Sequence, residues 1–153
     1  MAPSRNAGTL AATACVEWSV MLKLVLVDDS LAIQRSLSRM LRSIPGVDLV
    51  GMAGDRVAAL SLIESARPDV VLLDVNLPYG ERGIDVLHHL KREHPWAQVI
   101  VLTNAVSPKL RQSYLDAGAR GYFDKAAEFG QACAWIAAQA LRSSPAPDAD
   151  GLA

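Results

Sequence analysis

Five residues of this chain have side chains that could carry out phosphoryl chemistry. They are Asp28, Asp29, Asp74, Thr103 and Lys125. Carboxylates that lie close together repel one another and stay ionised only with a cation among them, and their oxygen ligands suit Mg²⁺. The hydroxyl and the ammonium can bind phosphoryl oxygens. Asp74 is the candidate nucleophile because it stands alone, whereas the adjacent pair suits metal binding. Its attack on phosphorus would give an aspartyl phosphate.

These residues stand at the ends of short apolar runs, and the runs predict strands. Runs rich in valine and leucine with little polar alternation are typical of parallel strands that helices cover on both faces. In an open parallel sheet, ligands bind just beyond the carboxyl ends of the strands. We therefore expect the five side chains to meet in one crevice. The predicted strands, including one without a candidate residue, are 22–27, 47–52, 70–73, 99–102 and 121–124.

Helix signals fill the segments between the predicted strands. Ser30, Asp55 and Ser107 are predicted N-caps, and further helices are expected over about 84–93 and 127–141. The alternation predicts an α/β fold: a doubly wound, five-stranded parallel sheet with helices on both faces. The residues predicted to face the core are Ile33, Leu37, Met40, Leu41 and Ile44 in the first helix, Leu60 and Ile63 in the second, Ile84, Leu87 and Leu90 in the third, and Phe129, Cys133, Ile136 and Ala140 in the last.

The composition is typical of one globular domain without a basic surface. The chain has 153 residues and a net charge of -1, so charge gives no argument for nucleic acid or an anionic membrane as a partner. No apolar run approaches the length of a membrane span. Cys15 and Cys133 form no CxxC pair, which favours a reducing cytoplasm. We expect one domain over 21–142, with a disordered extension over 1–20 and a disordered tail over 143–153.

The predicted extension has two other interpretations. Met21 stands directly before the first predicted strand, so it could be the true start of the chain. Ala12, Thr13 and Ala14 before Cys15 resemble a lipoprotein signal. The apolar segment before this cysteine is too short for such a signal and has one basic residue, which disfavours export.

Four segments of the sequence resemble the functional segments of response-regulator receiver domains, which belong to bacterial two-component signalling. They are LVLVDDS, VVLLDVNLP, VIVLTNA and GYFDKA, in the order usual for that family. The resemblance extends over about 22–141 and implies the flavodoxin-like receiver fold. It also implies a phosphoryl donor, which would be a sensor histidine kinase, a phosphotransfer protein or a small molecule such as acetyl phosphate.

The resemblance implies a role for each candidate residue. Asp74 would be the phosphoacceptor, and Thr103 and Lys125 would bind the phosphoryl group. The cofactor would be Mg²⁺ or Mn²⁺. Its ligands would be Asp29 directly, Asp28 often through water, Asp74, and the main-chain carbonyl of Asn76; Thr103 and Tyr122 would form the switch that responds to phosphorylation.

Two positions depart from the family pattern. Four residues separate Pro78 from Gly83, one more than the commonest spacing, so we expect a longer loop beside Asp74. Ala126 follows Lys125, where a cis proline is common, and this leaves the conformation of the last loop open. Neither change touches the five candidate residues.

The predicted function is that of a stand-alone receiver, because only a short tail follows the last predicted helix. It would signal by binding an unknown effector protein, with homodimerisation left open and with neither DNA nor a membrane as a partner. It would catalyse its own phosphorylation and dephosphorylation rather than act as an enzyme on other substrates. A phosphorelay intermediate or phosphate sink is the alternative within the class. A haloacid-dehalogenase-like phosphatase is the alternative of another class, but it needs an acid at the position of Asn76. A DNA-binding regulator is a further alternative, which the lack of a helix-turn-helix motif or a basic stretch disfavours.

Trp135 is a candidate partner contact, because it is predicted on the polar side of the last helix and tryptophan is frequent where interfaces concentrate their energy. The structural alternative is a ring packed over a neighbouring loop. The three histidines, His88, His89 and His94, are predicted to be ordinary surface or half-buried residues.

Overall fold

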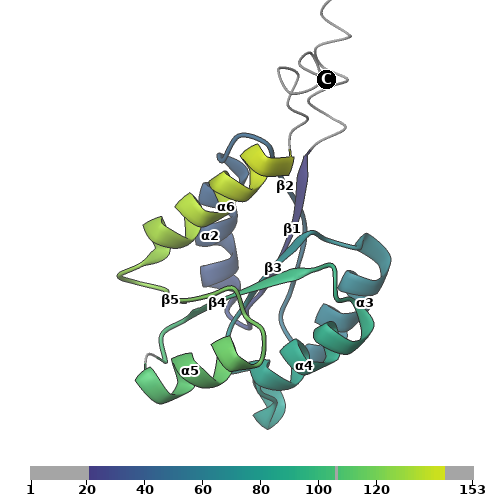
Figure 1. Cartoon of the computed structure of the whole chain (residues 1–153), viewed down its shortest axis with the longest axis vertical. Coiled ribbons are helices and arrows are strands. Elements are labelled where there is room, and N and C mark those ends of the chain that lie inside the picture. The colour runs from purple at the N-terminus through teal and green to yellow at the C-terminus, as the bar shows by residue number, and fades with distance from the viewer. Residues whose placement is uncertain (1–20, 106, 144–153) are drawn as a thin grey trace, which may run out of the picture.

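Residues 21–105 and 107–143 are described by a computed structural model, and they contain one sheet of five parallel strands. The strands are β1 (Leu22–Val27), β2 (Val47–Ala53), β3 (Val70–Leu73), β4 (Gln98–Thr103) and β5 (Gly121–Asp124). Their order is β2-β1-β3-β4-β5 (Figure 1). The chain places β2 on one side of β1 and then β3, β4 and β5 on the other side. The topological switch point therefore lies between β1 and β3. The predicted fold class is confirmed.

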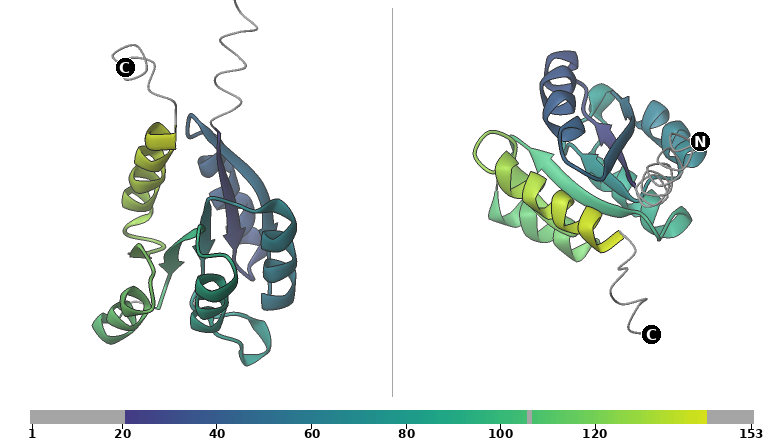
Figure 2. Two further views of the ribbon diagram at one scale, coloured as in Figure 1. Left: turned by 45° about the vertical axis from the view of Figure 1, so that its right-hand side comes forward. Right: turned by 90° about the horizontal axis from the view of Figure 1, so that it is seen from above.

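Helices cover both faces of the sheet (Figure 2). They are α2 (Leu31–Arg42), α3 (Arg56–Ala66), α4 (Gly83–Glu93), α5 (Pro108–Asp116) and α6 (Phe129–Ser143), with a short 3-10 helix, η1 (Pro78–Gly80). Side chains of a strand alternate between the two faces. In β1, Leu24 and Leu26 pack with α2 and α6, whereas Val25 and Val27 pack with α3, α4 and α5.

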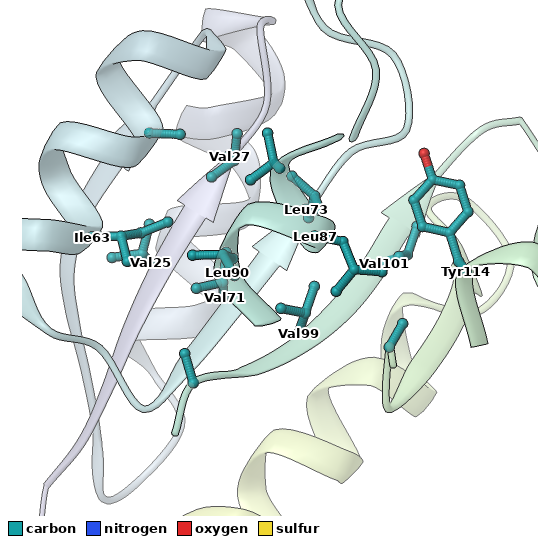
Figure 3. Packing of buried hydrophobic residues seen from close by; sticks show 14 of the residues in the cluster. Val25, Val27, Ile63, Val71, Leu73, Leu87, Leu90, Val99, Val101 and Tyr114 are labelled. Atoms are coloured by element: carbon teal, nitrogen blue, oxygen red, sulfur yellow. The ribbon is translucent and has the colours of Figure 1, made fainter. Parts of the chain in front are cut away.

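The core between the sheet and the three helices α3, α4 and α5 is built mainly of valine and leucine (Figure 3). Ile63, Leu87 and Tyr114 enter it from the three helices in turn, and none is more than 2% exposed. Burial of such a side chain contributes about 1.5–3 kcal/mol. This packing fixes the strands, and with them the strand ends that carry the candidate residues.

Three helices, α2, α3 and α5, begin directly after the N-cap residues that the sequence predicts. Ser30, Asp55 and Ser107 each accept a hydrogen bond from the main-chain N–H three residues later, at 2.8 to 3.2 Å. These are the predicted N-caps. A capping side chain of this kind contributes about 1 kcal/mol, so each cap helps to define where the loop after a strand ends.

Two details of the predicted helices are wrong. Met40 is 50% exposed. Leu37 and Leu41 define the buried side of α2, and at about 100° per residue Met40 lies to one side of both. The last helix begins at Phe129 rather than near 127. A carboxylate oxygen of Asp124 accepts the N–H groups of Ala126 and Ala127 and holds these two residues in a turn before the helix.

Within 21–105 and 107–143, no helix has the length and apolar character needed to cross a membrane. The predicted extension over 1–20 and the tail residues 144–153 lie outside the described residues. The predictions about Met21 as a start and about Cys15 concern that undescribed extension.

Candidate functional site

Three carboxylates meet at the carboxyl end of the sheet, at its switch point. Asp28 and Asp29 follow β1, and Asp74 follows the neighbouring strand β3. One oxygen of each carboxylate lies within 4.8 Å of the other two. Asp28 and Asp74 are 1% and 8% exposed, whereas Asp29 is open to solvent. The structure thus brings together the three predicted acids in a site with one accessible side.

Lys125 reaches the acidic cluster from the loop after β5. Its Nζ donates a hydrogen bond to Asp28 and another, of 3.1 Å, to Asp74. Burial acts to lower the pKa of Lys125, but its hydrogen bonds with these two carboxylates and their negative charges outweigh burial, so the pKa is raised. Lys125 therefore remains an ammonium and neutralises part of the cluster.

The donor set fits a hard divalent cation. Three carboxylates and one ammonium leave the cluster with net negative charge, and Asp29 makes no ion pair within the described part of the chain. Oxygen ligands with an open side are the kind that Mg²⁺ uses when it keeps waters and binds a phosphate oxygen. The cluster can hold a metal ion.

Thr103 ends β4 and lies beside the loop that carries Lys125. Its Oγ1 accepts a hydrogen bond from the Ala105 main-chain N–H at 3.1 Å, and its carbonyl accepts one from the Lys125 N–H at 2.8 Å. The side chain is buried, with 1% exposure for the residue. Because Oγ1 acts as an acceptor towards Ala105, its own proton is available for another acceptor.

Tyr122 lies with its ring turned into the protein. Its hydroxyl donates to the Ala105 carbonyl, and its own carbonyl accepts a 2.7 Å hydrogen bond from Arg111. Burial, and secondarily the charge of Asp74, raise the pKa of Tyr122. The Tyr114 ring packs against Tyr122, with centroids 5.7 Å apart and planes inclined by 55°. Sequence analysis missed Tyr114, because its importance comes from this contact and not from a local motif.

Gly83 closes the loop beside Asp74, and sequence analysis gave it no role. A Cβ at this position would lie 2.3 Å from the main-chain oxygen of Asp74. The Gly83 N–H also donates to the Val75 carbonyl at 2.7 Å. The loop between Asp74 and Gly83 turns through two residues with positive φ, Tyr79 at 65° and Gly80 at 74°. Gly83 stands three residues after Gly80, and no local sequence pattern shows its contact with Asp74.

The remaining predicted site residues lie outside this hydrogen-bonded group. Asn76 is exposed, and its main chain pairs with that of Arg82 across the loop. Trp135 is half-buried and packs against the core beneath α2 and α6. This packing tests neither the loop contact nor a role in partner binding, and both stay predictions.

His94 is buried, so the prediction of a surface or half-buried position is wrong for this residue. It is 5% exposed, and its Nε2 lies 3.2 Å from Glu64. The rings of His94 and Trp96 pack edge to face, with centroids 4.9 Å apart. The periodicity of α4 could not show this, because His94 is the C-cap and its neighbours come from α3 and the following loop.

Comparison with known proteins gives the family of this chain. The family model described as the response regulator receiver domain matches residues 24–137. The chain belongs to this family. The matched range contains the acidic cluster, Thr103, Tyr122 and Lys125, so the receiver domain and the site described above coincide. The matched family is not the haloacid-dehalogenase-like family of the phosphatase alternative.

Curated relatives of this receiver include longer proteins. The DNA-binding transcriptional activator DevR/DosR of Mycobacterium tuberculosis is 38% identical over 105 residues, which are 69% of this chain and 48% of that protein. Response regulator GacA of Pseudomonas syringae is 35% identical over 107 residues, 70% of this chain and 50% of that protein. The chain spans about half the length of these relatives.

The prediction that excluded DNA as a partner is contradicted by the description of DevR/DosR as DNA-binding. That prediction rested on the net charge and on the lack of a DNA-binding motif in a sequence that aligns with only 48% of this relative. Neither observation bears on the part of a longer protein that lies outside the aligned receiver. The expectation of a stand-alone receiver is likewise not confirmed.

Solved structures show the same fold. A two-component response regulator of the LuxR family from Aurantimonas sp. SI85-9A1 has a TM-score of 0.71 at 30% identity, over 78% of this chain and 86% of that one. The signal receiver domain of NarL from Mycobacterium tuberculosis also has a TM-score of 0.71, at 28% identity, over 78% of this chain and 96% of that one. These similarities confirm the receiver fold.

Proposed function

We propose that this receiver accepts a phosphoryl group on Asp74 from a histidine kinase. The observation that carries the proposal is the position of the Lys125 ammonium, which binds both Asp74 and Asp28 while Asp29 stays accessible beside them. The site therefore combines a buried carboxylate, a fixed positive charge and two further acids. A phosphoryl group that enters from the open side meets the Asp74 carboxylate next to groups that can neutralise its charge.

The transfer step needs no proton from the receiver. An oxygen of the ionised Asp74 carboxylate attacks phosphorus, the phosphorus–nitrogen bond to the donor histidine breaks, and its electron pair stays on the imidazole. The Lys125 ammonium donates to a phosphoryl oxygen. The Thr103 hydroxyl donates to another, using the proton that its hydrogen bond with Ala105 leaves available.

Asp28, Asp29 and Asp74, with the main-chain carbonyl of Asn76, are the proposed ligands for Mg²⁺ or Mn²⁺. Such a cation supplies positive charge that offsets the carboxylates and the phosphoryl oxygens. The residues themselves set the geometry: Asp28 is held by Lys125 and by the Ser30 N–H, which donates to Asp28 at 2.9 Å. This leaves the accessible Asp29 as the carboxylate best placed to adjust to a metal ion.

The same contacts link phosphorylation to the switch. Movement of Thr103 towards the phosphoryl group would disturb its hydrogen bond with Ala105. The Ala105 carbonyl in turn holds the Tyr122 hydroxyl. Tyr122 is therefore proposed to respond to phosphorylation through two successive hydrogen bonds, which link Thr103 at the end of β4 to Ala105 and Ala105 to Tyr122 in β5.

Labelling with acetyl phosphate tests the proposal. On phosphate-affinity gels we expect wild-type protein to shift in the presence of Mg²⁺, and neither Mg²⁺-free protein nor the Asp74→Asn variant to do so. Asp48→Asn, which changes an exposed acid on β2, is the matched control and should be labelled like wild type. Undiminished labelling of Asp74→Asn would refute the phosphoacceptor assignment.

A further inference from the structure

A pocket separate from the acidic cluster lies between α4 and α5, which are neighbours in Figure 1. We call it the α4–α5 pocket. Its volume is about 410 Å³, within the range of about 300–1,000 Å³ that is typical of small-molecule sites. Asn76 and Ala105 are among its lining residues, and they stand two residues beyond Asp74 and Thr103 respectively. Part of the lining therefore comes from the segments that follow Asp74 and Thr103, although none of the three acids lines the pocket.

Most of the pocket wall is apolar and firmly placed. Val75 and Tyr114 belong to the buried core, and Ile84 and Leu110 pack against it. The Tyr114 ring is the aromatic part of this wall, and it also packs against the Tyr122 ring, which does not line the pocket. A ligand with a compact ring or branched aliphatic body would therefore find a preformed apolar surface.

The polar part of the wall favours an anion. Arg82 and His88 contribute a guanidinium and an imidazole, and no carboxylate is among the described residues that line the pocket. Arg82 has one nearby acid, Asp85, at 3.8 Å, but both side chains are exposed, so this pair is weak and leaves the guanidinium available. The N-terminus of α4, whose N-cap Arg82 provides no side-chain cap, adds the positive end of a helix at the same place.

We infer that the α4–α5 pocket binds a small amphipathic monoanion: one carboxylate on a compact aromatic or branched aliphatic body. The carboxylate lies against Arg82 and His88, and the apolar body lies against Ile84, Leu110 and Tyr114. The acidic cluster would repel the same molecule. The site goes beyond the proposed function, and binding requires neither metal nor phosphorylation.

Phenylacetate is the probe for this inference, and phenylacetamide is its neutral counterpart. With the full, unphosphorylated chain, we expect saturable chemical-shift changes at the amides of Ile84, His88 and Leu110, with a Kd on the order of 1 mM for so small a ligand. Phenylacetamide should bind at least about fivefold more weakly, because it lacks the charge that Arg82 recognises. No saturable shift with phenylacetate, or equal binding of the amide, overturns the inference.

Paired variants locate the site. Arg82→Gln should weaken phenylacetate binding at least about fivefold, whereas Arg92→Gln, an exposed arginine of α4 outside the pocket, should not change it. Ser113→Phe should abolish binding by filling the pocket, and Gln112→Phe, on the adjacent outward position of α5, should not. Binding that survives Ser113→Phe in a folded variant overturns the assigned site. If that variant fails to fold, the wild-type shift map decides alone.

Discussion

Among single residues, Lys125 has the largest expected effect on the electrostatics of the site. Its ammonium lies between Asp28 and Asp74, so Lys125→Met would leave two buried carboxylates to repel each other. We expect the free energy of unfolding in metal-free buffer to fall by about 1–3 kcal/mol. Added Mg²⁺ should then stabilise the variant more than wild type, because a bound cation replaces the missing charge. Thermal unfolding with and without Mg²⁺ measures both effects.

A lysine remote from the cluster provides the control for that experiment. Lys109 is exposed in the first turn of α5, and Lys109→Met removes the same charge without touching the acids. It should unfold close to wild type and respond to Mg²⁺ as wild type does. Equal gains from Mg²⁺ in Lys125→Met and wild type would show that lysine and metal do not neutralise the same carboxylates.

At the scale of elements, the loop between β3 and α4 depends on Gly83. Alanine is the better helix former by about 1 kcal/mol, and this alone would favour Gly83→Ala at the start of α4. The added Cβ would lie 2.3 Å from the Asp74 main-chain oxygen, and this contact outweighs the preference because backbone cannot move aside freely. We expect Gly83→Ala to lower the unfolding free energy by about 1–3 kcal/mol and to slow labelling by acetyl phosphate. Urea denaturation and phosphate-affinity gels measure the two results.

Gly130→Ala is the matched control for Gly83→Ala. Gly130 lies exposed in α6 and has open space where a Cβ would point. Alanine there should leave stability unchanged or raise it by up to about 1 kcal/mol. If both glycine variants behaved alike, helix propensity would dominate and the contact with Asp74 would not constrain the loop.

The elements also show what the sequence could predict. The strand ends that carry Asp74 and Lys125 were predictable, because buried parallel strands are nearly unbroken apolar runs and the chemistry follows directly after them. The N-caps were predictable for the same local reason. Gly83, Tyr114 and His94 were not, since each acquires its role from a contact with another element of the fold. Hydrophobic periodicity records which side of an element is buried and does not record its neighbour.

At the scale of the whole molecule, the two faces of the sheet have different relations to the site. The face beneath α3, α4 and α5 contains the Tyr114–Tyr122 contact and the α4–α5 pocket. The other face, beneath α2 and α6, contains Trp135 and is packed through leucine, alanine and isoleucine. Ala105, in the loop after β4, lines the α4–α5 pocket and is hydrogen-bonded to Thr103, the candidate-site residue at the end of β4. A change in the conformation of the loop after β4 should therefore affect the residues around α5 before those beneath α2 and α6.

The buried tyrosine of that region should make the stability of the whole fold sensitive to alkaline pH. Burial raises the pKa of Tyr114 from 10.0 to about 12, against the opposing hydrogen bond from the Ile84 main chain. The unfolded chain thus loses this proton at lower pH than the folded one. The protonated Tyr114 phenol makes its full contribution to the free energy of unfolding below pH 10, and this contribution is lost as pH rises towards 12. It amounts to about 2–3 kcal/mol.

Tyr122 and Lys125 also have raised pKa values, so their deprotonation changes stability in the same direction. We therefore expect wild-type protein to lose stability steeply above pH 10, and Tyr114→Phe to lose about 2–3 kcal/mol less between pH 9 and pH 12 because it has no phenol to ionise. Urea denaturation at fixed temperature across this range provides the comparison, with Tyr79→Phe as the control because Tyr79 is 89% exposed. Parallel curves for wild type and Tyr114→Phe would mean that this buried phenol does not govern the alkaline transition.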